Sequence, residues 1–171
     1  RSNFYFPLDS DHDFVFRLRN KWAWGRGYGD TESLPFYENY FAGGITSVRG
    51  FERNSLGIET RPDPTTANSP DPFGGDLLFE NSAELIFPLP FVKDQRSLRL
   101  SYFVDSGNVF NTANNTAESF SFDAGELRWS TGVSLQWITF IGPLGFSLGK
   151  AINDVTGDDT QFFQFSLGQP F

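Results

Sequence analysis

The chain has 171 residues, about one domain's worth, and its 21 acidic and 13 basic residues give a formal net charge of -8. A nucleic-acid surface needs a basic stripe, so an acidic chain of this kind excludes nucleic acid as a partner. The absence of cysteine excludes a disulfide framework and a thiolate metal site. Aromatic residues make up 18% of the chain, and 21 of them are phenylalanines.

An alternation of period two runs along the chain and predicts β-strands. After a short strand around residues 3–8, the segment 14–25 has phenylalanine, leucine and tryptophan at even positions and arginine and lysine at odd ones. A similar split recurs in residues 77–87, 98–105, 128–141, 144–149 and 163–171. We therefore predict about seven strands, each with one apolar and one polar face.

The segments that connect these strands alternate between short and long. The short ones contain DSDHD, PFVKDQR and FIGP, and the long ones cover residues 30–75, 111–126 and 152–160. Bacterial outer-membrane barrels have this asymmetry, with short periplasmic turns and long outer loops. No run of 18 apolar residues predicts a membrane helix, but a strand crosses a bilayer with only ~9–11 alternating residues.

A soluble antiparallel sandwich also alternates and is the other interpretation of these strands. Two features favour a membrane barrel: a polar face rich in glycine and serine, and aromatics near strand ends, as in Trp22, Trp24 and Trp137. Seven strands cannot close a bacterial single-chain barrel, which has an even number of eight or more. We therefore expect the C-terminal portion of a larger barrel, whose open strand edges would favour self-association.

Candidate catalytic and metal-binding residues are scarce. His12 is the sole histidine, so a Ser-His-Asp constellation would depend on a residue of the turn 9–13. The aspartates of this turn have calcium-loop spacing, but Phe14 and Asn20 stand where an EF-hand needs glycine and glutamate. We predict no catalytic residue, no metal site and no cofactor, and hence no enzyme.

The segment 30–75 is far longer than the ~12–15 residues beyond which loops are uncommon unless functional. It contains Val48-Arg49-Gly50-Phe51 within FYENYFAGGITSVRGFERNSLG. Together with FENSAELIFPLP, RLSYFVDSGNVF, STGVSLQWITFIGPLGFSLGKAI and QFFQFSLGQPF, in this order, the segment resembles the BamA family of outer-membrane β-barrel assembly factors. A sister family of translocation and assembly barrels has a similar loop motif and is the nearest alternative.

The resemblance implies an all-β, antiparallel transmembrane barrel of sixteen strands, of which residues 1–171 form the C-terminal part and 30–75 an extracellular loop. In that family the loop folds back into the lumen and its arginine meets acids on the inner wall. By position those acids are Glu84 and Asp105, and the alternation separately places both on the polar, inward face. The planar fork of Arg49 suits carboxylates. Gly50 permits close approach to the wall, and Phe51 is expected to pack beneath the arginine.

The C-terminal segment resembles the β-signal by which outer-membrane proteins are recognised for assembly. Phe163, Phe165, Leu167 and Phe171 alternate up to a terminal aromatic residue. Gly168 matches the position at which the family's last strand kinks inward. Since the same pattern also fits an ordinary final strand, its role as a signal is an expectation from the resemblance.

The function implied by the resemblance is the folding and insertion of β-barrel proteins into the outer membrane of a Gram-negative bacterium. The implied partners are outer-membrane lipids and client β-barrel proteins. Assembly-machine lipoproteins would bind through N-terminal POTRA domains. We expect those domains and the early strands of the barrel to be missing from this chain, so the fragment is not expected to act alone. A passive outer-membrane porin or transporter is the alternative from another class, and it would have an unobstructed lumen.

Overall fold

The computed structural model describes residues 1–11, 13–29, 31, 33–60, 71–89, 97–112 and 124–168. Seven of its strands form one sheet in the order β1-β2-β5-β6-β7-β8-β9, and every neighbouring pair is antiparallel. These strands are β1 (Ser2–Pro7), β2 (Val15–Trp24), β5 (Leu77–Phe87), β6 (Leu98–Phe110), β7 (Arg128–Thr139), β8 (Gly142–Ala151) and β9 (Phe163–Leu167). The predicted all-β, antiparallel fold class is therefore confirmed, although the sheet stays open, with β1 and β9 at its edges.

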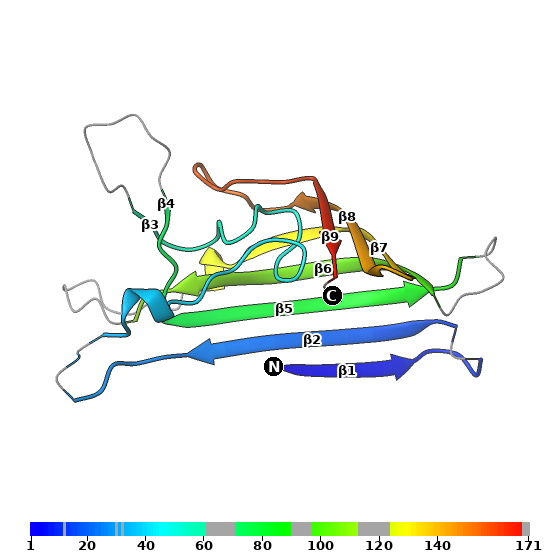
Figure 1. The fold of residues 1–171 in the computed structure, drawn as a ribbon, viewed down its shortest axis with the longest axis horizontal. Coiled ribbons are helices and arrows are strands. Elements are labelled where there is room, and N and C mark those ends of the chain that lie inside the picture. The colour runs from blue at the N-terminus through cyan, green and yellow to red at the C-terminus, as the bar shows by residue number, and fades with distance from the viewer. Residues whose placement is uncertain are drawn as a thin grey trace.

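The sheet is curved, and the long connection between β2 and β5 lies against its inner side (Figure 1). Its described part contains the 3-10 turn η1 (Phe36–Glu38) and a two-stranded ribbon of β3 (Glu59–Thr60) and β4 (Asp71–Pro72). A second 3-10 turn, η2 (Ala124–Glu126), precedes β7. Helical turns of this length, the longest in the described part of the chain, are too short to cross a membrane.

The two faces of the sheet follow the predicted alternation. In β5 the residues from Leu78 to Glu84 at even positions are buried, and the odd positions between them are only partly buried. In β2 the buried pair is Arg17 and Arg19, whereas Trp22 and Trp24 are exposed. The inner face of the sheet is thus the polar one, as the sequence indicates.

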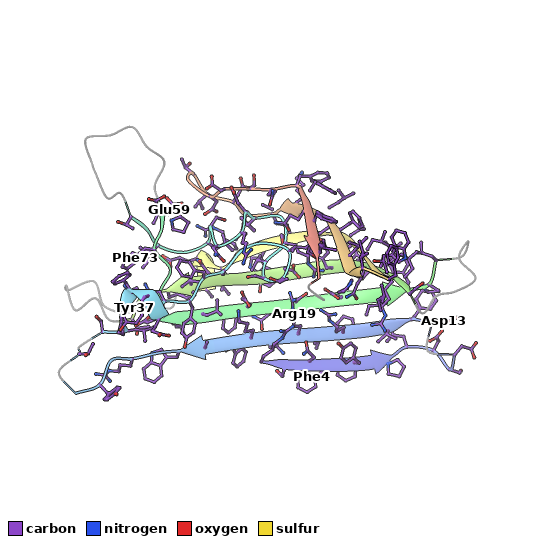
Figure 2. All side chains as sticks on the ribbon, viewed as in Figure 1. Phe4, Asp13, Arg19, Tyr37, Glu59 and Phe73 are labelled. Carbon is purple, nitrogen blue, oxygen red and sulfur yellow. The ribbon has the colours of Figure 1, made fainter. Side chains whose placement is uncertain are left out.

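The outer face is apolar and uncovered, as Phe4 of β1 shows (Figure 2). Its exposed residues include Trp22, Tyr102, Trp129, Val133, Trp137, Leu148, Phe163, Phe165 and Leu167. A soluble sandwich would bury this face against a second sheet. The described residues contain no such sheet, since their other strands are only the short β3–β4 ribbon. A contiguous apolar surface of this kind suits lipid, as in the outward face of transmembrane barrels.

The two ends of the sheet differ as the connection lengths predict. Tyr37 and Phe73 lie at the end where the long connections emerge, and Asp13 lies at the opposite end (Figure 2). β6 continues to Phe110, five residues beyond the predicted 98–105. Two other predicted boundaries were wrong by a residue or two. Phe14 precedes β2, where its N–H is bonded to Asp9, and the turn between β7 and β8 is only Phe140 and Ile141.

Candidate functional site

The loop core, which we define as residues 40–57, is held in place by backbone contacts. Tyr40 pairs with Gly75, just before β5, in an isolated bridge that fixes one end of the core at the rim of the sheet. A second bridge, between Ala42 and Leu56, joins the two ends of the core to each other. Between them, the N–H of Gly44 donates to the carbonyl oxygens of Val48 and Phe51, both at 3.1 Å. The segment 45–51 is therefore a compact turn closed by its own backbone hydrogen bonds.

Two glycines let this turn approach the wall closely. Gly50 has a φ of 88°, in the left-handed region that favours glycine. Gly149, which faces inward from β8, has no room for a side chain, because an added Cβ would lie 2.8 Å from the backbone nitrogen of Gly50. The backbone of the loop thus packs directly on the backbone of β8.

Arg49 is completely buried, and its guanidinium meets both predicted acids. Its Nε lies 2.7 Å from Oδ2 of Asp105, its Nη2 lies 2.7 Å from Oδ1 of the same carboxylate, and Nη2 is 2.6 Å from Oε1 of Glu84. The backbone N–H of Arg49 also donates to Asp105, at 3.1 Å. Arg49 and Asp105 therefore form a two-pronged contact of the kind only an arginine can make.

The surroundings of the guanidinium keep it charged. Its carbon Cζ lies 3.7 Å from the centre of the Phe103 ring, a cation-π contact inside a desolvated site. Burial alone would lower the pKa of Arg49, but the charges and hydrogen bonds of Asp105 and Glu84 outweigh burial and raise that pKa. Ser82 and Ser134 accept two further hydrogen bonds, at 2.9 and 3.2 Å.

A second set of contacts holds the loop core at Thr46 and Ser47, just before Arg49, through side chains of β2 and β5. The guanidinium of Arg19 donates to the carbonyl oxygens of Thr46 and Ser47, at 3.2 and 3.0 Å. The hydroxyl of Ser47 donates to the carboxylate of Glu80, which also pairs with Lys21 at 3.2 Å. The loop is therefore anchored by charged residues at two successive points of the inner wall.

Val48 and Phe51 belong to an apolar cluster between the loop and the wall. Both are fully buried, and the cluster also contains Ala42, Leu56, Leu78 and Val109. Phe51 was expected beneath the arginine, and this detail is corrected by the structure. The ring under the guanidinium is that of Phe103 from β6, and Phe51 instead forms a bridge with Thr160.

The C-terminal candidates lie on the outer face of the last strand. Phe163, Phe165 and Leu167 of β9 are each about half exposed. Gly168 has a φ of 80°, which permits a change of direction directly after the strand. Phe171 lies outside the described residues.

Several residues of this site were not predicted. Phe103 is an aromatic residue at an inward position of β6, and this departure from the polar pattern was the signal that could have found it. Ser82 and Ser134 share the inward face with many other serines, so nothing in the sequence singles them out. Gln164 of β9 contacts the loop from a third direction and is likewise one of several inward polar residues.

Known proteins are similar to this chain over nearly its whole length. The Omp85 superfamily domain matches residues 1–171. An outer membrane protein assembly factor BamA from Neisseria meningitidis serogroup B is 34% identical over 98% of the chain, and the BamA of Nitratidesulfovibrio vulgaris is 31% identical over 98%. The chain spans only 23% and 19% of the length of these two relatives.

A solved structure agrees with the fold. The crystal structure of BamA from Haemophilus ducreyi lacking POTRA domains 1-3 matches 95% of this chain and 32% of its own length, with a TM-score of 0.81 and 37% identity. The resemblance to BamA proteins that the sequence indicated is confirmed by these matches. The chain belongs to the Omp85 superfamily.

Proposed function

We propose that this chain is the C-terminal part of a barrel that folds and inserts β-barrel proteins into the outer membrane of a Gram-negative bacterium. Its relatives from N. meningitidis and N. vulgaris are named outer membrane protein assembly factors. The partners would be outer-membrane lipids, client β-barrel proteins, and lipoproteins that bind elsewhere on the full-length protein. The role is not enzymatic, because it orders strands without breaking covalent bonds.

The observation that carries this proposal is the seating of Arg49 on Asp105 and Glu84. A passive porin needs a free lumen, whereas here the loop core is anchored on the inner wall by a buried arginine. The anchored loop supports a role in which the inner side of the barrel is a structural support rather than a path for solutes.

Two further features support the proposal. The apolar outer face, with Trp22 and Trp137 exposed on it, suits contact with lipid chains and headgroups. Among the described residues, the last strand, β9, is five residues long and pairs with β8 only. An exposed strand edge is a template for pairing with another chain, and a client strand could add to it by main-chain hydrogen bonds.

The test is client folding by the full-length protein reconstituted in liposomes. An unfolded outer-membrane barrel is added, and its folded fraction is followed by protease protection and by its shifted electrophoretic mobility. We expect faster folding than with empty liposomes, and slower folding when the reconstituted protein carries Arg49→Ala. Ser147→Ala is the matched control, since Ser147 is buried on the same wall but its hydroxyl has no hydrogen-bond partner among the described residues.

The opposite outcome would identify the alternative. If the wild-type protein folds the client no faster than empty liposomes do, and the same liposomes carry a steady ionic conductance, the chain belongs to a passive pore. If the Arg49→Ala variant folds clients at the wild-type rate, the chain has the assembly role but that role does not depend on the loop anchor.

A further inference from the structure

The loop segment next to Arg49 lies beside the chain that leads into the last strand. The N–H of Gln161 donates to the carbonyl oxygen of Gly50 at 2.9 Å, and the N–H of Glu52 donates to that of Asp159 at 2.8 Å. Between these bonds, Phe51 and Thr160 form an antiparallel bridge. The loop thus adds a short antiparallel ladder to residues 159–161, directly before β9.

A side chain of β9 itself holds the same loop segment. Gln164 is 4% exposed and points inward. Its Nε2 donates to the carbonyl oxygen of Phe51 at 2.6 Å, and its Oε1 accepts from the N–H of Gly50 at 3.4 Å. A primary amide donates and accepts at once, so it can pair with a peptide backbone as another peptide group would. Gln164 therefore recognises the backbone of Gly50 and Phe51.

These contacts connect two distant parts of the sheet through adjacent residues of the loop. Arg49 is held by Asp105 of β6 and Glu84 of β5, and the next two residues are held by β9 and the segment before it. Along the sheet, β7 and β8 separate β6 from β9. The loop is thus a second connection between these strands, across the inner side of the curve (Figure 1).

The last strand is the element that this connection stabilises most. β9 has only five residues in register with β8 and no strand on its other side among the described residues. An edge strand with so few backbone pairs opens locally at a small cost in free energy. Contacts from the loop to Gln164 and to residues 159–161 therefore add a sizeable share of what holds β9 in place.

We propose that Gln164 is a positioning residue that couples the docking of the arginine loop to the order of the last strand. β9 stays fully paired with β8 only while Arg49 is seated on β5 and β6, and the loop keeps its place only while Gln164 holds its backbone. The inference deepens the proposed function, on which its biological meaning rests, because β9 is the edge that a client strand would reach.

The test is amide hydrogen exchange of the full-length protein in lipid nanodiscs, without any client. In Arg49→Ala, which alters no residue of β9, we expect the amides of residues 163–167 to exchange about tenfold faster, the effect of losing roughly one hydrogen bond's worth of stability. In Gln164→Ala we expect a similar increase for residues 50–52. Exchange in β1 should not change, since a global loss of structure would affect that strand too.

Two variants sharpen the comparison. Ser166→Ala is the control, because Ser166 lies on the same face of β9 as Gln164 and its buried hydroxyl has no hydrogen-bond partner in the described part of the chain. In this variant both segments should exchange as in the wild type. Arg49→Lys keeps the positive charge and provides a second test if Arg49→Ala does not fold, with a smaller increase expected at residues 163–167.

The proposal is overturned if Arg49→Ala or Arg49→Lys speeds exchange in the loop core while residues 163–167 exchange at the wild-type rate. It is also overturned if Gln164→Ala leaves residues 50–52 unchanged. Both outcomes are independent of client folding. A failure of the proposed function would show as wild-type protein that does not fold clients, whatever the exchange rates are.

Discussion

Replacing Arg49 with alanine is expected to release the loop core from the inner wall. The substitution removes both prongs of the contact with Asp105, the ion pair with Glu84 and the cation-π contact with Phe103. Asp105 is then left fully buried without its counter-charge, and Glu84 keeps, among the described residues, the ion pair with Arg17 at 3.4 Å. The loop core would lose its main anchor, although Arg19 and Glu80 would still hold Ser47.

The burial of the site sets the size of this effect. In a water-filled lumen the loss would be about 1–3 kcal/mol, as for a hydrogen bond whose partner is removed. Arg49 and Asp105 are both 0% exposed, however, so the figure for a broken buried ion pair applies, about 3–5 kcal/mol. At 1.4 kcal/mol per factor of ten, the fraction of molecules with an undocked loop would rise by about a hundredfold or more.

The assay is limited proteolysis of the loop in the full-length protein, combined with client folding. Cleavage follows the population of the open form when opening and closing are fast. Asp105→Asn and Glu84→Gln are measured alone and in combination with Arg49→Ala. Each single change should cost less than the arginine change, and each should add little to it, because all three residues belong to one interaction.

Additivity would refute this reasoning. If the effect of Asp105→Asn on cleavage is the same in the wild type and in Arg49→Ala, the two residues contribute independently and the loop is held by other contacts. Ser147→Ala serves again as the control on the same wall, and its cleavage rate should equal that of the wild type.

Three other substitutions or measurements test the same structure. Arg49→Lys should restore only part of the docking, leaving a deficit of about 1–2 kcal/mol in the same proteolysis assay, because an ammonium lacks the two-pronged geometry. Gly149→Ala should weaken the docking of the loop by about 1–3 kcal/mol, since the added Cβ would lie 2.8 Å from the backbone nitrogen of Gly50. Ser147→Ala should leave the docking unchanged. Trp22, 62% exposed on the outer face, should be strongly quenched by brominated acyl chains in a single-tryptophan variant, and no quenching would place that face in water.

Much of the fold could be predicted because the period of a β-strand is fixed by its backbone. Successive side chains point to opposite faces, so the alternation around Arg17 and Glu84 placed both on the inner side before any pairing was known. Boundaries were less certain, since Phe14 and Ile141 continue the apolar alternation but lie in turns. The short ribbon and the two 3-10 turns in the long connections have no comparable period and were not predicted.

The sequence by itself predicted the seven strands of the sheet and their two faces, and its resemblance to a family predicted that Arg49 would meet Glu84 and Asp105. Only the tertiary structure decided which other residues surround the contact of Arg49 with the two acids. The partners of the loop come from positions as far as 114 residues away, as with Gly50 and Gln164. Which inward side chain reaches the loop depends on the curvature of the sheet and on the path of the chain across it. Neither is encoded in a local pattern, because the inward residues of every strand look alike until the sheet curves and brings a few of them together.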